Sequence, residues 1–381
     1  MVKFQNTDDA KCWQGCGNTR ILIRCWGDAN VQRQKPLDDE KKHSGFHTDF
    51  TSEVQQAAIQ AKEIILRERD LLNNRSSVSE FILVGLSTSQ ETQIFFFAIF
   101  FLVYVAIIVG NLLIVISVIV DNHLHSPMYF FLANLSFFDL CLSSAATPKG
   151  ISDFLRKHKT ISWWGCMIQM FFMHFFGGGE MFLLIAMAID RHVAICKPLH
   201  YKTIMSHRVL TGFLLLSWVI GLIHSTSQMV FTVNLPFCGP NVLDSFFCDL
   251  PLVIKLACTD TYTLELLVIV NSGFLSLICF LLLLISYAVM LVTIWQRSSS
   301  ASSKALSTLS AHITVVTLSF GPAIFIYAFP FNSYSVDKFL SVFYSIITPL
   351  LNPIIYTLRN QEMKAAIKRL SNQHIGSWLT P

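Results

Sequence analysis

Two carboxylates stand inside long apolar stretches of this sequence, where an ionised side chain is costly. Asp139 is the single Asp, Glu, Lys or Arg of 127–146, and Glu180 is the single one of 166–189. A charge at the centre of a membrane-spanning helix costs roughly 3 kcal/mol or more. We therefore predict a functional role for each of these two carboxylates. Two such carboxylates in one bundle can hold a sodium ion or share a proton. The alternative is that one is protonated and hydrogen-bonded to Ser or Asn neighbours.

Four cysteines flank the apolar stretches on one side of the predicted membrane. Cys166 begins the third stretch, and Cys238, Cys248 and Cys258 lie between the fourth and the fifth. Thiols gathered on one face suit an oxidising, extracellular side, and four cysteines allow three disulfide pairings. A free buried thiol is the better interpretation of the remaining cysteines near or within the spans, Cys141, Cys196 and Cys279.

A metal centre or an enzyme active site is not indicated elsewhere. Cys12, Cys16 and Cys25 supply three quarters of a zinc-site pattern, but the closest fourth ligands, His43 and His47, are irregularly spaced. The sequence contains no nucleophile–base set and no metal-ligand cluster. We therefore expect no enzymatic activity, and no cofactor apart from the sodium ion considered above.

The elements that position these residues are seven apolar helices. Hydrophobic residues make up 53% of the 381 residues, charged residues make up 14%, and the mean hydropathy is +0.53. A spanning helix needs roughly 20 apolar residues. The runs are continuous rather than alternating, which excludes the strands of a β-barrel. They cover 94–120, 127–146, 166–189, 209–231, 264–295, 306–329 and 339–358.

Polar segments flank the predicted bundle. Residues 1–72 read as a polar, disordered extension, 73–370 as the seven-helix domain and 371–381 as a short tail. After the seventh run, Met363 and Ile367 share a face opposite Lys364, which predicts an amphipathic helix on the inner leaflet. Ten Lys and Arg on one side of the bundle against six on the other favour an outside N-terminus.

The extension carries two further features. Asn74-Arg75-Ser76 is a glycosylation sequon about twenty residues before the first span. Residues 11–26 resemble the cysteine-containing C-terminal segment of a retrotransposon protein, although Arg24 stands where that pattern has His. This resemblance implies a fusion of unrelated segments rather than an evolved domain.

Motifs over 73–370 occur in the order typical of one family. They are GN at 110–111, LHSPMYFFLANLS at 124–136, MAIDRHVAICKPL at 187–199, SY at 286–287, KALSTLSAH at 304–312 and PLLNPIIYTLRN at 349–360. The chain resembles the odorant receptors, rhodopsin-like G-protein-coupled receptors, and within them the tetrapod (class II) type and family 4. It departs from the family pattern at His192, where Tyr is usual, and at Leu309, where Cys is usual.

The resemblance implies a signalling switch and two disulfides. Arg191 would be held by the neighbouring Asp190 until activation frees it, and His192 would tune this step because histidine can charge near physiological pH. The disulfides implied are Cys166–Cys248 and Cys238–Cys258. The residues implied to carry the switch are Asp190, Arg191, Tyr287, Lys304, His312, Asn352, Pro353 and Tyr356.

The resemblance also implies a ligand site in the outer half of the bundle. Thioether, aromatic and aliphatic walls with a few polar groups suit a small, volatile, apolar molecule. The absence of a carboxylate among these positions argues against an amine. The matching positions are Met170, Met173, His174, Gly177, Gly178, Asn271, Ser272, Leu275, Phe320, Ala323, Ile324, Tyr327 and Ser345.

The function expected is therefore that of an odorant receptor of the plasma membrane, with membrane lipids but no nucleic acid as partners. It would activate a stimulatory heterotrimeric G protein and raise cyclic AMP. A proton pump using Asp139 and Glu180 is one alternative, but it gives no reason for the Asp190-Arg191 pair, and the seventh run lacks the Lys of a retinal-linked pump. The other alternative is a non-functional product whose long extension blocks delivery.

Overall fold

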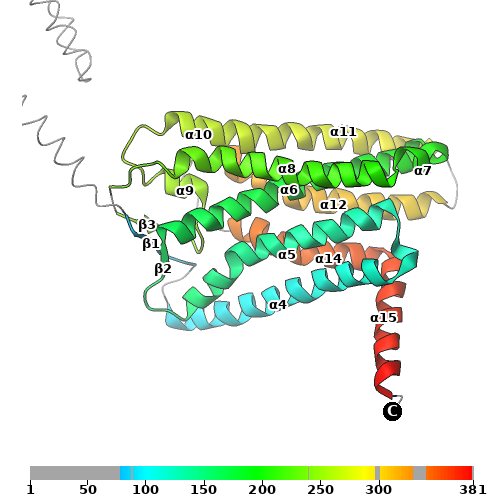
Figure 1. Ribbon diagram of the computed structural model, residues 1–381, viewed down its shortest axis with the longest axis horizontal. Helices are drawn as coiled ribbons and strands as arrows, with labels where there is room; N and C mark the ends of the chain where they lie inside the picture. Colours follow the sequence, from blue (N-terminus) through cyan, green and yellow to red (C-terminus); the bar gives the residue numbers. More distant parts are fainter. Residues whose placement is uncertain (1–77, 87–88, 239, 297–300, 329–339, 380–381) are drawn as a thin grey trace, which may run out of the picture. The chain divides into compact units, whose positions relative to one another are not determined.

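The computed structural model describes residues 78–86, 89–238, 240–296, 301–328 and 340–379. The chain divides into two units, Met1–Asn74 and Arg75–Pro381, and every described residue belongs to the second. Within the described residues, seven helices are long and apolar enough to cross a membrane, which confirms the predicted fold class. The helices lie side by side along the long axis of this unit (Figure 1).

The seven spans follow the predicted apolar runs closely. The first four are single helices: α4 (Gln90–Val120), α5 (Pro127–Phe154), α6 (Trp163–Cys196) and α8 (His207–Thr232). The fifth span joins α10 (Tyr262–Val268), η3 (Ile269–Phe274) and α11 (Leu275–Gln296), the sixth is α12 (Ala301–Ala328), and the seventh joins η4 (Phe343–Ile347) to α14 (Thr348–Arg359).

The second span is longer than the apolar run predicts. Helix α5 continues to Phe154 and so includes Lys149, which the sequence pattern places in the following loop. Lys149 pairs with Asp153 one helical turn later. Because charges spaced by four residues share one helix face, this pair lets the helix extend beyond its apolar segment.

Helices α5, α6 and α12 form the centre of the bundle. Each buries 56% of its apolar window, whereas α4, α8 and the fifth span bury 22%. The outer helices direct many large apolar side chains outward, as Leu102, Leu215 and Leu282 do. Such surfaces are suited to contact with lipid. The buried polar groups therefore lie on the central helices, away from the lipid.

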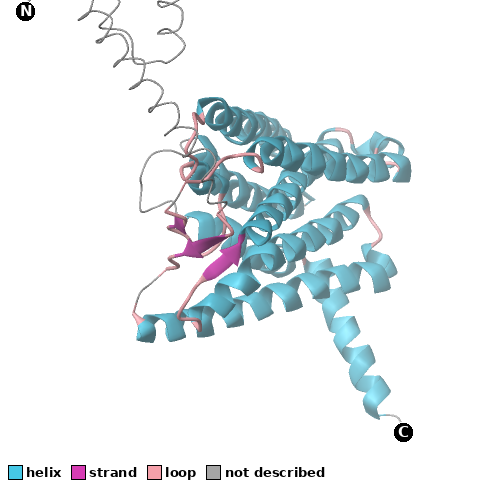
Figure 2. Cartoon of the chain, turned by 60° about the vertical axis from the view of Figure 1, so that its left-hand side comes forward, coloured by secondary structure: helices cyan, strands magenta, loops and turns pink. Residues whose placement is uncertain are grey.

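A small sheet closes one end of the bundle, which we call the disulfide end. Strand β1 (Glu80–Leu83) lies between β2 (Thr160–Ser162), to which it is antiparallel, and β3 (Val242–Leu243), to which it is parallel. Figure 2 shows the three strands beside the helix ends. Phe81 and Leu83 of β1 are buried there, so the segment before the first span is part of the packed structure.

The opposite end holds the short helices η1 (Asn122–Leu124), η2 (Pro198–His200) and α7 (Tyr201–Ile204), while α9 (Leu250–Ile254) belongs to the disulfide end. Helix α15 (Gln361–Leu379) follows the seventh span and crosses the bundle direction (Figure 1). Met363 and Ala366 on its inner face are fully buried, and Lys364 on the opposite face is exposed. This is the amphipathic helix that the sequence pattern predicts.

Candidate functional site

A cavity of about 380 Å³ lies among α6, α8, the fifth span, α12 and η4. Its walls are mainly apolar, and no Asp, Glu, Lys or Arg is among the lining residues that the structure describes. Ten of the thirteen predicted ligand positions line it, namely Met173, His174, Gly177, Gly178, Asn271, Ser272, Leu275, Phe320, Ala323 and Tyr327.

The other three predicted positions do not line this cavity. Met170 is only 1% exposed and packs in the apolar cluster at the disulfide end. Ile324 packs against the central apolar cluster. Ser345 is fully buried and donates a hydrogen bond of 2.7 Å from its hydroxyl to the Ser341 carbonyl of its own helix. Each of these side chains is therefore used in helix packing.

Two π-helical turns shape the cavity wall. The turn η3 carries Asn271 and Ser272, and the turn η4 carries Tyr344, which also lines the cavity. A π-turn inserts an extra residue into a helix and redirects side chains, and such turns are frequent at functional sites. Asn271 Nδ2 donates to Ser227 Oγ at 2.7 Å, and Gln228 Nε2 donates to Ser272 Oγ at 3.0 Å. Both polar groups of η3 are thereby fixed to α8.

The glycine pair of α6 makes room for two polar rings at the cavity. A Cβ atom added at Gly177 would lie 2.1 Å from the Tyr344 hydroxyl, and one added at Gly178 would lie 3.1 Å from the His224 ring. Any larger residue at Gly177 would displace the Tyr344 hydroxyl. The close approach of α8 and η4 to α6 thus depends on these two glycines.

Two imidazoles from different helices face the cavity. His174 comes from α6 and His224 from α8, and their ring centroids are 5.6 Å apart. Tyr327 from α12 lies 5.7 Å from His174 on the same measure. His224 is absent from the predicted site, because a lone histidine in an apolar run carries no signal of which side of its helix meets the cavity.

The two buried carboxylates have different polar partners. Asn352 of α14 donates from Nδ2 to both carboxylate oxygens of Asp139, at 3.2 and 2.9 Å. Ser319 of α12 donates to Glu180 Oε1 at 3.2 Å. Both carboxylates are fully buried. Asp139 therefore joins the second span to the seventh, and Glu180 joins the third to the sixth.

Several buried oxygens in this polar layer lack a hydrogen-bond donor among the described residues. They include Glu180 Oε2, Asn352 Oδ1 and Asn111 Oδ1. Oxygen atoms alone are the ligands that a hard cation such as sodium prefers, and an added proton would also satisfy Glu180. The donor set fits the predicted cation, although the described residues contain no group of three His, Cys, Asp or Glu that could hold a metal.

Asp190 is the centre of the polar contacts at the end opposite the disulfides. Arg191 donates to Asp190 Oδ2 from its guanidinium, and the Tyr201 hydroxyl donates to Asp190 Oδ1 at 2.8 Å. Burial and the neighbouring Asp190 carboxylate raise the pKa of Tyr201, so its hydroxyl keeps the proton that it donates. The pairing of Asp190 with Arg191 was predicted, whereas the contribution of Tyr201 from α7 was not.

Three other predicted switch residues, Tyr287, His312 and Tyr356, lie on α11, α12 and α14. Tyr287 of α11 and His312 of α12 are hydrogen-bonded, with 3.1 Å between the hydroxyl and Nδ1. His192, the departure from the family pattern, lies 3.3 Å from the Ser286 hydroxyl through Nδ1. The buried Tyr356 hydroxyl has no partner among the described residues.

Pro353 packs where the first and seventh spans meet. A Cβ atom added at Gly110 of α4 would lie 3.2 Å from the Pro353 ring, so the two helices are in close contact here. Asn111 supports the same contact by donating from Nδ2 to the Pro349 carbonyl at 3.0 Å. Pro353 therefore has a packing role in the arrangement described.

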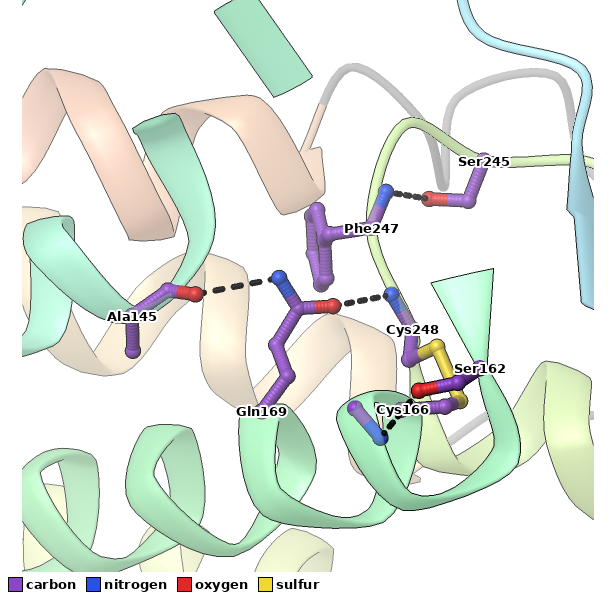
Figure 3. The surroundings of a disulfide bond; sticks show 8 residues. Ala145, Ser162, Cys166, Gln169, Ser245, Phe247 and Cys248 are labelled. Carbon is purple, nitrogen blue, oxygen red and sulfur yellow. Dashed lines mark hydrogen bonds between the residues drawn. A yellow bond between two sulfur atoms is a disulfide. The ribbon is translucent and has the colours of Figure 1, made fainter. Parts of the chain in front are cut away.

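The disulfide end contains the two bonds implied by the resemblance, Cys166–Cys248 and Cys238–Cys258. Figure 3 shows Gln169 beside the first of them. Its Nε2 donates to the Ala145 carbonyl of α5 at 3.0 Å, and its Oε1 accepts from the Cys248 amide at 2.9 Å. Gln169 thus links α5, α6 and the long loop, a role that no local pattern in the sequence indicates.

Some predicted features lie outside the described residues. They are the sequon at Asn74, the extension 1–72 with its cysteines, and the side chain of Lys304.

Comparisons with known proteins agree on one family. The family model described as "Olfactory receptor" matches residues 100–374. The chain is 69% identical to human olfactory receptor 4K13 over 296 residues, which are 78% of this chain and 97% of that protein. It is 65% identical to human olfactory receptor 4K14 over 303 residues (79% and 98%) and 63% identical to human olfactory receptor 4L1 over 306 residues (80% and 98%).

Proposed function

Since this chain belongs to the olfactory receptor family, we propose that it binds a small volatile molecule in the cavity between α6 and α12 and activates a stimulatory heterotrimeric G protein. Membership makes the chain a multi-pass G-protein-coupled receptor of the plasma membrane and not an enzyme. The ligand site, the kind of G protein and the rise in cyclic AMP are the proposal.

The proposed orientation has the disulfide end outside the cell and α15 inside. The two disulfides support it, because such bonds persist in an oxidising compartment. The amphipathic face of α15 suits the inner leaflet, where exposed lysines meet anionic lipids. The glycosylation proposed at Asn74 would then lie on the outer side.

The apolar cavity is the observation that carries the proposal. At about 380 Å³ it falls in the lower part of the usual range for ligand sites, roughly 300–1,000 Å³, which suits a small molecule. Its walls come from five different spans, so a ligand that fills it contacts the sixth helix as well as the third and the fifth. Such a ligand can favour one helix arrangement over another through its unequal contacts with them.

The contacts of Asp190 with Arg191 and Tyr201 are the part of the molecule proposed to respond to ligand binding. An outward movement of the inner end of α12 would separate His312 from Tyr287 and release Arg191 from Asp190. The cleft thus opened would receive the G protein. The buried oxygens near Asp139 and Glu180 would hold a sodium ion or a shared proton in the resting arrangement.

The test measures cyclic AMP in cells exposed to a broad panel of volatiles. Ala323→Phe fills the cavity and is expected to abolish the response, and Arg191→Ala is expected to abolish coupling. Ala106→Phe adds the same ring to the exposed surface of α4 and should leave the response intact. A response that survives Ala323→Phe at normal surface expression would refute the ligand site.

A further inference from the structure

We propose that the cavity selects volatile molecules that carry one hydroxyl group on an apolar skeleton, with the hydroxyl held between the imidazoles of His174 and His224. The inference rests on the proposed function and narrows it to a chemical class, alcohols and phenols.

His174 is a buried polar side chain that the protein itself leaves without a hydrogen bond. It is 7% exposed and lines the cavity, and neither ring nitrogen has a partner among the described residues. Its ring neighbours are His224 and Tyr327. An unpaired buried polar group is costly unless something in the cavity bonds to it.

The ring of His224 packs against the third span. It lies over Gly178, where a Cβ atom would come within 3.1 Å, and it lines the cavity together with Asn271. Asn271 in turn donates to Ser227 at 2.7 Å. The contact with Gly178 therefore holds the His224 imidazole at the cavity wall, beside an Asn271 side chain that is itself fixed to α8.

The charge of the cavity decides what the pair can bind. With no acidic residue in the described lining to compensate an imidazolium, both histidines are held as neutral rings. A neutral imidazole has one N–H donor and one nitrogen acceptor. Two such rings therefore offer a donor from one and an acceptor from the other.

A hydroxyl group is the small substituent that matches this pair. It donates one hydrogen bond and accepts another, and with bonds of about 2.8 Å it bridges nitrogens that are about 4.5–5.5 Å apart. The ring centroids at 5.6 Å allow such a separation. An ether, aldehyde or ketone only accepts and leaves one imidazole unsatisfied, whereas an ammonium group would be buried without an anion.

The remaining cavity accepts the apolar skeleton. Phe320, Leu275, Met181 and Ile223 form walls of aromatic, aliphatic and thioether groups. A molecule whose polarity is confined to one end would place it at the histidines and bury the rest against these side chains.

The experiment uses the full-length receptor, purified in detergent, and measures its thermal stabilisation by sets of ligands on matched skeletons. Linear, cyclohexyl and phenyl skeletons are each tested as the alcohol, methyl ether, aldehyde, carboxylic acid and amine. We expect alcohols to stabilise the receptor at concentrations roughly tenfold lower than the matched ethers, because the ether lacks the one hydrogen bond that the alcohol donates; tenfold corresponds to about 1.4 kcal/mol. Cyclic AMP in cells should follow the same order.

Substitutions test whether the two histidines cause the preference for alcohols. His174→Phe and His224→Phe keep a flat ring but remove its polar atoms, and each should bring the alcohol-to-ether ratio close to one. His207→Phe makes the same change at the exposed start of α8, outside the cavity, and should keep the ratio. The comparison of ligands in the unchanged receptor stands even if a variant fails to fold.

The outcomes separate this inference from the proposed function. Ethers that act as well as alcohols, or carboxylic acids that act better than both, would overturn the hydroxyl inference and leave the cavity as an odorant site. Failure of every compound in both assays would contradict the proposed ligand site itself, and the inference with it.

Discussion

Tyr201 and Arg191 divide the carboxylate of Asp190 between them, since the tyrosine hydroxyl donates to Oδ1 at 2.8 Å and the guanidinium pairs with Oδ2. Tyr201 lies in α7, beyond the end of the third span. The carboxylate is therefore oriented by two elements, one of which belongs to the loop. A conformational change in this loop would therefore alter the contacts of Arg191 through the Asp190 carboxylate that Tyr201 and Arg191 share.

Removing the Tyr201 hydroxyl should raise the signal without ligand. In Tyr201→Phe, Asp190 loses one hydrogen bond and holds Arg191 less firmly, and a loss of about 1 kcal/mol shifts a two-state equilibrium roughly fivefold. Basal cyclic AMP, normalised to surface expression, measures the effect. Tyr262→Phe, on a side chain that is 69% exposed, should leave the basal signal unchanged. Equal basal signals in both variants would show that Tyr201 does not restrain Arg191.

Asn352 is expected to be essential for stability because it is the described partner of a fully buried carboxylate. In Asn352→Leu, Asp139 keeps its burial but loses both hydrogen bonds, at a cost of about 2–3 kcal/mol. Thermal unfolding of the purified receptor measures this loss. Asn134→Leu provides the control, since the hydrogen bond that Asn134 makes among the described residues goes to the Phe130 carbonyl of its own helix. Similar unfolding temperatures for the two variants would contradict the role assigned to Asn352.

The bond between Cys166 and Cys248 should be required for delivery to the cell surface. Cys166→Ser frees the long loop from the third span and leaves Gln169 as its tether at this point, so misfolded chains are retained. Surface staining of intact cells reports the result. Cys141→Ser removes a free cysteine and should be delivered normally. Normal staining of Cys166→Ser would mean that the loop holds its place without the bond.

The ion pair between Asp121 and Arg369 ties α15 to the end of the first span, with 2.5 Å between Arg369 Nη2 and Asp121 Oδ2. The hydrogen bond from Arg369 lowers the pKa of Asp121. The contribution of this ion pair to the stability of the fold is therefore present above the unfolded-state pKa of Asp121. It is lost as the pH falls through the lower folded-state pKa of Asp121.

Arg369→Gln should consequently lower the unfolding temperature by the same small amount at mildly acidic and mildly basic pH. The difference from the unchanged receptor should vanish in strong acid. Lys368→Gln, on the exposed face of the same helix, serves as the control. A difference that grows as the pH falls would contradict the assignment.

The sequence predicts those features that depend on local composition. Seven apolar runs predict the spans because each helix must satisfy its backbone within itself and present apolar side chains to lipid. Asp139 and Glu180 are found the same way, since a charge in such a run is conspicuous. Most of the cavity positions follow from the resemblance to a family.

Contacts made between distant segments are the features that sequence reasoning misses. Gln169 reads as an ordinary polar residue near a helix end, and only the folded chain brings Ala145 and Cys248 to its two amide atoms. His224 reaches the cavity because Gly178 leaves room for its ring. The sheet around β1 likewise needs three segments to meet, two of them too short to show a strand pattern.

The most direct test of the proposed function is nucleotide exchange on a purified stimulatory G protein by the purified receptor in lipid nanodiscs. A volatile that stabilises the receptor should accelerate exchange, and Arg191→Ala should bind the same volatile without accelerating it. Binding without acceleration by the unchanged receptor, or equal acceleration by Arg191→Ala, would contradict the proposal that this receptor signals to that G protein through Arg191.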